Sequence, residues 1–356
     1  MKTITWGLFF LIGVGLLLGG LDWLQGNRRG LGSRFQEGFS SMGPLMLGMA
    51  GILCLVPLLG QLLQGPADRL GRILGLDPAV FSSVLACDMG GYPLAEVLAK
   101  ESWAASYSGL LVGSMLGCTV SFLLPVGLNL VRKSGYASFF QGILLGLVGI
   151  PAGGLAGGLL AGFPLRPMVW NTVPVLVLSL ALLAGLQFFQ HGTLLGCRAF
   201  ARILNGISLL GLLAGGCSYI WGWQVLPGLG KIQDAILIVG GIALFLAGTF
   251  PLMELVTRGV QHRNDREASK EKSLSAALLL IAVNPLPVLM EYDTFSAEKQ
   301  IKSAAFMVCA SCVMGDHLGY AASAASDFVL PLVVGKLVGG LVALGAAELY
   351  CRKKRK

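Results

Sequence analysis

Eleven apolar stretches run along the chain and are separated by short polar loops. Most of them reach the ~20 residues that a membrane-spanning helix needs. They cover residues 4–24, 42–63, 80–98, 104–130, 138–162, 168–190, 203–223, 232–257, 275–292, 303–326 and 328–350. The pattern predicts an all-α polytopic membrane protein.

The two shortest stretches, 80–98 and 275–292, are interrupted at their centres. Asp88 and a pair of glycines break the first stretch, and Asn284-Pro285 breaks the second. Three landmarks recur in the two halves of the chain at separations of 194, 196 and 198 positions: Pro57 and Pro251, Asp88 and Asn284, and Gly117 and Gly315. Broken segments in corresponding positions of two repeats point to a binding site near the bilayer midplane.

The distribution of Lys and Arg favours one topology over another. If all eleven stretches cross the membrane, the basic residues of the loops and tail divide 13 against 12 between the two sides. If 80–98 and 275–292 are re-entrant hairpins, the division is 19 against 6. Because cytoplasmic loops carry an excess of basic residues, we expect nine transmembrane helices plus two re-entrant hairpins. Eleven spanning helices are the alternative.

This topology predicts two inverted repeats. Residues 1–162 form the first repeat, with its hairpin near 80–98, and residues 203–356 form the second, with its hairpin near 275–292. Residues 163–202 supply a connector helix. The N-terminus is expected outside and the C-terminus in the cytoplasm.

Composition agrees with a membrane protein and limits its partners. Hydrophobic residues make up 55% of the chain and charged residues 12%, with a mean hydropathy of +0.76. A soluble protein carries about 25% charged residues. The net charge of +8 arises from loops and the C-terminal tail, which is typical of topology rather than of nucleic-acid binding. The expected surroundings are a lipid bilayer.

No residue pattern calls for a cofactor or a metal. No G-x-x-x-x-G-K-[ST] motif occurs, so direct use of ATP is not expected. Cys309 and Cys312 form a C-x-x-C pair in the middle of a predicted span, and no second pair or histidine stands at zinc-site spacing. We interpret the two cysteines as small packing residues.

Asp88 is the sharpest candidate for a substrate or ion ligand. A carboxylate at the centre of a spanning helix costs about 2.5–3.5 kcal/mol on insertion scales. The neighbouring Met89 and Gly90 are expected at the same site, since glycine permits the sharp turn there. The alternative is a structural carboxylate that caps the following helix or pairs with Lys336.

Asp316 and His317 form a second polar interruption, inside stretch 303–326. Such a pair can bind a cation or relay protons. It can also be an internally satisfied pair that stabilises the span. Lys336 is expected to balance the charge of Asp88 or Asp316.

Asn284 and Tyr107 complete the candidate site. Asn284 offers an amide beside the unwound carbonyls expected near Pro285, although simple helix termination is an alternative. Tyr107 can offer an aromatic face to a cation, and packing is its alternative role.

Several motifs occur in order along most of the chain: FQEGFSSMG at 35–43, ACDMGG at 86–91, YSGL at 107–110, GSMLG at 113–117, WQVLPGL at 223–229, GDHLGYAA at 315–322 and VGKLVGG at 334–340. Together they resemble the ethanolamine utilization permease family, of the EutH type. The resemblance implies a bacterial inner-membrane protein that brings ethanolamine to a cytoplasmic ammonia-lyase pathway. The second break of the family resembles Asn-Asn-Ile-Pro, whereas this chain has Pro at position 285, so one amide is lost.

We therefore expect transport of ethanolamine, as ethanolammonium, into the cytoplasm for its catabolism, by alternating access or facilitated diffusion around a midplane site. An aliphatic amine is protonated at neutral pH, and a carboxylate, carbonyl or amide acceptors and aromatic faces suit it. Whether a proton or sodium ion is coupled to transport, and whether the protein is a homo-oligomer, stay open.

Three alternatives remain. The first is a transporter of another small organic cation or amino alcohol. The second is an intramembrane aspartyl protease with Asp88 and Asp316 as its dyad, which lacks the expected Gly-x-Gly before the second aspartate. The third is a sensor derived from a transporter.

Overall fold

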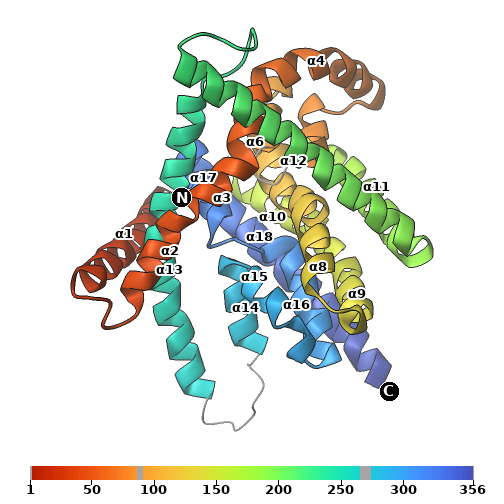
Figure 1. Cartoon of the computed structure of the whole chain (residues 1–356). Coiled ribbons are helices and arrows are strands. Elements are labelled where there is room, and N and C mark those ends of the chain that lie inside the picture. Colours follow the sequence, from red (N-terminus) through yellow and green to blue (C-terminus); the bar gives the residue numbers. More distant parts are fainter. Residues whose placement is uncertain (1, 86–90, 265–273, 356) are drawn as a thin grey trace.

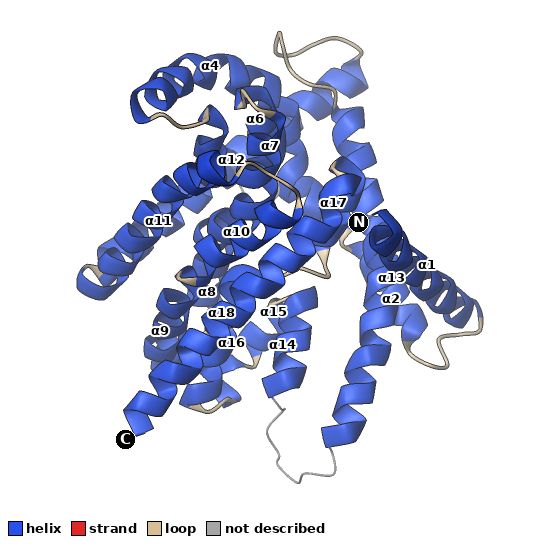
Figure 2. Ribbon diagram, turned by 180° about the vertical axis from the view of Figure 1, so that it is seen from behind, coloured by secondary structure: helices blue, strands red, loops and turns tan. Residues whose placement is uncertain are grey.

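The computed structural model describes residues 2–85, 91–264 and 274–355, and every regular element in that part is a helix (Figures 1 and 2). Eight helical segments there are long and apolar enough to cross a bilayer: Lys2–Leu24, Leu31–Leu74, Ser102–Leu130, Lys133–Leu160, Leu165–Phe188, Gln190–Trp221, Ile232–Gly259 and Ser326–Lys354. The prediction of an all-α polytopic membrane protein is confirmed.

Before residue 131, the described part of the chain folds into twelve helices. They are α1 (Lys2–Leu24), α2 (Leu31–Ser40), α3 (Met42–Leu45), the π-helix η1 (Met46–Ala50), α4 (Gly51–Leu74), η2 (Pro78–Phe81), α5 (Ser82–Leu85), α6 (Gly91–Leu98), α7 (Ser102–Ala105) and, in π and α geometry, η4 (Ser106–Gly117), η5 (Thr119–Leu123) and α8 (Leu124–Leu130). The long π-helical stretch η4 replaces the regular helix expected there.

The rest of the chain begins with the short η6 (Lys133–Gly135). It continues with α9 (Tyr136–Leu147), α10 (Gly149–Leu160), α11 (Leu165–Phe188), α12 (Gln190–Trp221), α13 (Ile232–Asn264), α14 (Leu274–Val283), α15 (Leu286–Met290), η7 (Tyr292–Thr294), α16 (Ala297–Ala310), α17 (Asp316–Ala324), η8 (Ser326–Phe328) and α18 (Val329–Arg355). Helix α12 begins at Gln190, well before the predicted start at 203.

Stretch 303–326 is not one continuous helix, and this corrects the sequence prediction. Helix α16 ends at Ala310 and α17 begins at Asp316, with an unwound segment between them. The Cys312 and Met314 amides donate to the carbonyls of Ile281 (3.1 Å) and Ala282 (2.7 Å) at the end of α14. The backbone groups freed by unwinding are satisfied by a second broken segment, as an apolar environment requires.

The basic residues before this stretch are also placed differently from the prediction. Lys299 and Lys302, expected in a loop, lie within α16 and are buried. Lys302 forms ion pairs with Glu298 and Glu348, and the Lys299 ammonium lies 3.7 Å from the ring centre of Phe295. Because their charges are compensated by these partners, α16 begins at Ala297, six residues before the apolar stretch that starts at 303.

The two ends of segment 77–101 meet at Asp77. One carboxylate oxygen of Asp77 accepts from Ala79 N at 2.9 Å, and the other accepts from Lys100 N and Glu101 N, both at 3.1 Å. The start of η2 and the residues after α6 therefore lie beside each other.

The chain also turns back after α14. Ile281 and Ala282 bond to the unwound segment at the C-terminal end of α16, whereas Tyr292 bonds to Gln300 near the N-terminal end of that helix. Between 282 and 292 the chain therefore runs back along α16. With 10 residues, α14 is only about 15 Å long, half of a bilayer core.

Glycines allow the long helices to approach closely. Helices α10 and α18 meet where Gly153 faces the Gly335 carbonyl. A Cβ atom added to Gly153 would lie only 2.5 Å from that carbonyl oxygen. Helix α1 packs on α13 through Gly15 and Gly248. In the same way, α4 packs on α12 through Gly51 and Gly211. Small residues of this kind are typical of helix contacts in membranes.

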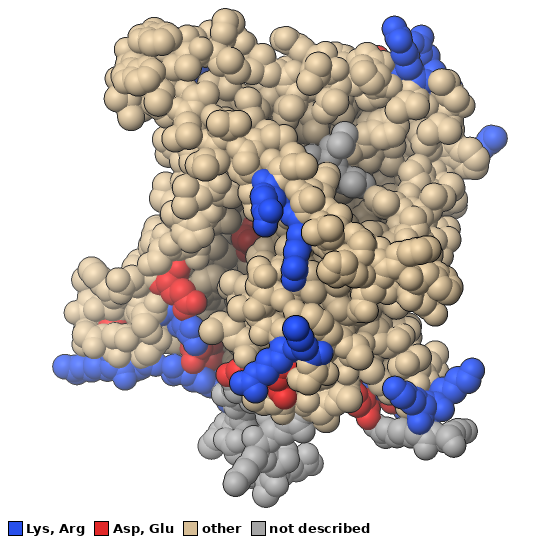
Figure 3. All heavy atoms as spheres, turned by 45° about the vertical axis from the view of Figure 1, so that its right-hand side comes forward, with Lys and Arg blue, Asp and Glu red and all other residues tan. Residues whose placement is uncertain are grey.

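Charged side chains are unevenly distributed over the surface. On the face shown in Figure 3, most Lys, Arg, Asp and Glu side chains lie toward the lower edge, and further basic side chains lie near the centre and at the upper right. Two examples of ion pairs are Arg34 with Glu254 and Arg258 with Glu254, at 3.0 and 2.8 Å. The first pair connects α2 to α13, and the second lies within α13.

Candidate functional site

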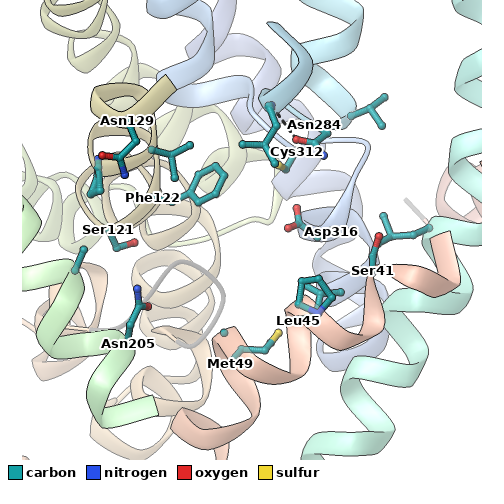
Figure 4. A pocket seen from close by; sticks show the side chains of 18 of the residues that line it. Ser41, Leu45, Met49, Ser121, Phe122, Asn129, Asn205, Asn284, Cys312 and Asp316 are labelled. Carbon is teal, nitrogen blue, oxygen red and sulfur yellow. Dashed lines mark hydrogen bonds between the residues drawn. The ribbon is translucent and has the colours of Figure 1, made fainter. Parts of the chain in front are cut away.

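A cavity of about 560 Å³ lies between the two halves of the chain. Residues of α3, η1, η5, α8, α12 and α13 line it, together with the turn after α14 and the unwound segment before α17 (Figure 4). Both broken segments of the second half therefore reach the same cavity.

Asp316 supplies a carboxylate to one wall of this cavity. It is the first residue of α17, is half-buried, and points toward the open space in Figure 4. Its Oδ1 accepts from the backbone amide of His317 at 3.0 Å. A negative charge is favoured at a helix N-terminus, so the unwound segment both exposes this carboxylate and stabilises its charge.

The unwound segment depends on two unusual backbone positions. Cys312 has a φ of +58°, which is uncommon for a residue other than glycine. Gly315 lies against the Val283 carbonyl, where a Cβ atom would overlap it. The close approach of the two broken segments therefore requires glycine at position 315.

Asn284 lies beside Cys312, on the same side of the cavity as Asp316 (Figure 4). Its side-chain oxygen accepts a hydrogen bond from Leu286 N at 2.9 Å, so the side chain also holds the first residue of α15 in place. Asn284 directly follows α14 and lines the cavity, and its role in binding stays a prediction.

The opposite wall carries polar residues that the sequence analysis missed. Ser121, Asn129 and Asn205 line the cavity across from Asp316, from η5, α8 and α12. The Ser121 hydroxyl donates to the Gly117 carbonyl at 2.7 Å. Amides inside otherwise apolar stretches were the signal that could have identified Asn129 and Asn205.

Apolar side chains make up the rest of the lining. Met49 and Phe122 lie between the polar groups in Figure 4, and Leu246 and Phe250 come from α13. A cavity of this volume suits a drug-sized molecule, and it far exceeds a small amine. The Asp316 carboxylate at one wall and the amides at the other therefore enclose a space that is wide enough to hold water as well as a ligand.

Three predicted residues do not line the cavity. His317 is fully buried beside Asp316. Lys336 is also fully buried, and its ammonium group donates to the Ser114 carbonyl of the π-helix η4 at 2.8 Å. The Tyr107 hydroxyl lies 2.5 Å from the Thr172 hydroxyl on α11, and its ring packs near Trp103, an arrangement that fits the packing role.

Asp88, Met89 and Gly90 lie outside the described residues. Their predicted role, and the pairing of Asp88 with Lys336 or with Asp316 in a dyad, stay predictions.

Within the described part of the chain, no group of three or more His, Cys, Asp or Glu side chains is placed to hold a metal ion. The Cys309 thiol is buried against the Gly146 carbonyl, at 3.7 Å, and Cys312 lines the cavity.

Comparison with known proteins identifies relatives over nearly the whole chain. The model of the family "Ethanolamine utilisation protein, EutH" matches residues 5–350. The chain is 36% identical to a "Probable ethanolamine permease EutH" of Listeria monocytogenes, over 96% of this chain and 93% of the relative. It is 33% identical to a protein of the same name from Salmonella typhimurium, over 91% and 86%. It is 32% identical to the "Uncharacterized protein YxeR" of Bacillus subtilis, over 97% and 94%. No solved structure matches the chain.

Proposed function

Because the chain belongs to the EutH family of ethanolamine utilisation proteins, we propose that it is a permease that carries ethanolamine across the bacterial cytoplasmic membrane. The substrate crosses as ethanolammonium and serves catabolism in the cytoplasm. The names of the relatives favour a transporter over an enzyme.

The observation that carries this proposal is the position of Asp316. Its carboxylate faces a cavity enclosed by helices that are apolar enough for a membrane. A primary amine is protonated at neutral pH, as the lysine side chain is. Asp316 binds the ammonium group, and the amides of Asn284, Asn129 and Asn205 are available to the hydroxyl group.

We place the opening of the cavity toward the end of the molecule where basic residues gather, because two lining residues stand close to arginines in the sequence. Asn129 precedes Arg132 by three positions, and Ala201, which also lines the cavity, adjoins Arg202. If this end is cytoplasmic, as the positive-inside rule indicates, the structure is an inward-facing state and the cavity is the cytoplasmic part of the substrate path. The N-terminus then lies outside and the C-terminus inside.

Two features support inverted repeats with re-entrant hairpins. Gly211 stands 196 positions after Gly15, and Gly248 stands 197 positions after Gly51, so α12 corresponds to α1 and α13 corresponds to α4. Helix α1 of the first repeat packs on α13 of the second, and α4 of the first repeat packs on α12 of the second. A two-fold relation between the repeats produces such an exchange. The meeting of both ends of segment 77–101 at Asp77 fits a hairpin that enters and returns.

Alternating access follows from this arrangement. Asp316 belongs to the second repeat, and Asn129, which faces it across the cavity, belongs to the first. Movement of one wall against the other closes the wide cavity around a small ligand, and it opens the other side around the same site.

Uptake into reconstituted vesicles tests the function. Purified protein in lipid vesicles is expected to take up labelled ethanolamine saturably, and vesicles without protein are not. Unlabelled ethanolamine should compete more effectively than choline, propanolamine or ethylamine. Stronger competition by one of these compounds would assign the transporter to another small organic cation, and an absence of any uptake would contradict the proposal.

A further inference from the structure

A second polar cluster is formed by residues of α6 and α17 that do not line the cavity. It consists of Tyr92 and Glu96 on α6 and Tyr320 on α17. Tyr92 and Glu96 are four positions apart, so they share one face of their helix. The Tyr92 hydroxyl lies close to the Glu96 carboxylate and to the Ser106 side chain. Tyr320 has Glu96 and Tyr92 as its ionisable neighbours.

Tyr320 is the unusual member of this cluster. Its side chain is fully buried, and its hydroxyl has no hydrogen-bond partner among the described residues. A buried hydroxyl without a partner costs about 1–3 kcal/mol. A buried unsatisfied group of this kind calls for an explanation, and contact with a ligand is the one that its neighbour Glu96 favours.

The cluster lies toward the end of the molecule opposite the basic loops. Phe328, four residues after α17, stacks on Phe163 at 5.6 Å, and Trp103, just after α6, packs on the same ring at 5.9 Å. The C-terminal ends of α6 and α17 therefore reach the same place. Tyr320 stands one helical turn, about 6 Å, beyond Asp316 in that direction.

We propose that Tyr92, Glu96 and Tyr320 form an outer binding site for a small primary ammonium ion, which passes from there to Asp316. This inference rests on the proposed function and extends it to the opposite face of the membrane. Glu96 is exposed and supplies the charge that attracts the cation. The Tyr320 hydroxyl accepts a hydrogen bond from the ammonium group, and the two rings offer electron-rich faces to it.

Two variants and a matched control test the site. Tyr320→Phe removes only the hydroxyl, and Glu96→Gln removes only the charge. Glu101→Gln is the control, because Glu101 is an exposed carboxylate five residues further along the chain, directly before α7. Initial rates of ethanolamine uptake are measured in right-side-out and in inside-out membrane vesicles.

In right-side-out vesicles we expect Tyr320→Phe and Glu96→Gln to raise KM about tenfold or more, as loss of a hydrogen bond to a charged group does. The maximal rate should change little, and in inside-out vesicles KM should change less. Glu101→Gln should behave as the wild type. A purely structural Tyr320 predicts the reverse: an unchanged KM and an equal or higher melting temperature, since an unsatisfied buried hydroxyl has been removed.

A binding measurement separates this inference from the proposed function. The melting temperature of the purified protein is titrated with ethanolamine for the wild type and both variants. Wild-type binding that both variants weaken supports the outer site even if no uptake is observed, in which case only the transport proposal fails. Equal binding and equal KM in the wild type and both variants overturn the outer site while leaving transport intact.

Discussion

At the scale of single residues, the candidate site depends on a few backbone groups held by polar side chains. Asp77 accepts three backbone N–H groups from the two ends of one segment, and Asn284 accepts one at the start of α15. Unwound backbone inside a membrane must find such partners. The residues that break helices are therefore also the residues that hold the broken ends in place.

Gly315→Ala tests the contact between the two broken segments. The added methyl group overlaps the Val283 carbonyl, so the segments must separate. We expect destabilisation by about 1–3 kcal/mol, as for other overpacked sites, and a lower melting temperature in detergent. Gly345→Ala is the control, because no atom lies within 4 Å of its added Cβ. Equal melting temperatures for the two variants would contradict the close contact.

Asp77→Ala tests the closure of segment 77–101. The variant leaves three backbone N–H groups without their acceptor, and we expect a loss of about 1–3 kcal/mol in stability. Hydrogen exchange at Lys100 and Glu101 should become faster. The control is Asp68→Ala, which removes only an exposed ion pair with Lys100 and should cost little. Unchanged exchange in Asp77→Ala would exclude this role.

At the scale of helices, the sequence predicted the apolar segments better than their continuity. Hydropathy located all eight long helical segments. It missed the unwinding of stretch 303–326, because Ser311 to Gly315 are small or apolar and do not lower the mean hydropathy. The break depends on hydrogen bonds to α14, which is distant in sequence, so no local pattern records it.

The same reasoning explains which site residues were found. Asp316 and Asn284 are a charge and a proline-adjacent amide in apolar stretches, and both reach the cavity. Asn129 lies next to the last residue of α8 and Asn205 lies in the middle of α12, so only the fold reveals their convergence. Tyr107, predicted to offer an aromatic face to a cation, instead directs its hydroxyl to α11.

The α10–α18 contact provides a prediction at this scale. Gly153→Val places a branched side chain against the Gly335 carbonyl, and the helices cannot approach as closely. We expect reduced folding yield and a melting temperature lower by several degrees, in line with a loss of about 1–3 kcal/mol. Ala156→Val, on a half-exposed position of the same helix, should be tolerated. If both variants fold equally well, the contact does not stabilise the protein.

At the scale of the whole molecule, the account requires one orientation in the membrane. Single cysteines introduced at Lys100 and at Lys133, both exposed, report the two ends. An impermeant maleimide added to intact cells should label Lys100→Cys, and it should label Lys133→Cys only after the cells are opened. The parent protein without either substitution is the control. The opposite labelling pattern would reverse the proposed orientation.

The central claim is that ethanolammonium crosses the membrane by way of the carboxylate of Asp316. The most direct test is the uptake of labelled ethanolamine by vesicles that contain Asp316→Asn, which keeps the shape of the side chain and removes its charge. We predict that saturable uptake falls about tenfold or more, while folding is unchanged. The control variant Asp327→Asn, at an exposed position, should show normal uptake. A wild-type KM and maximal rate in Asp316→Asn would contradict the account.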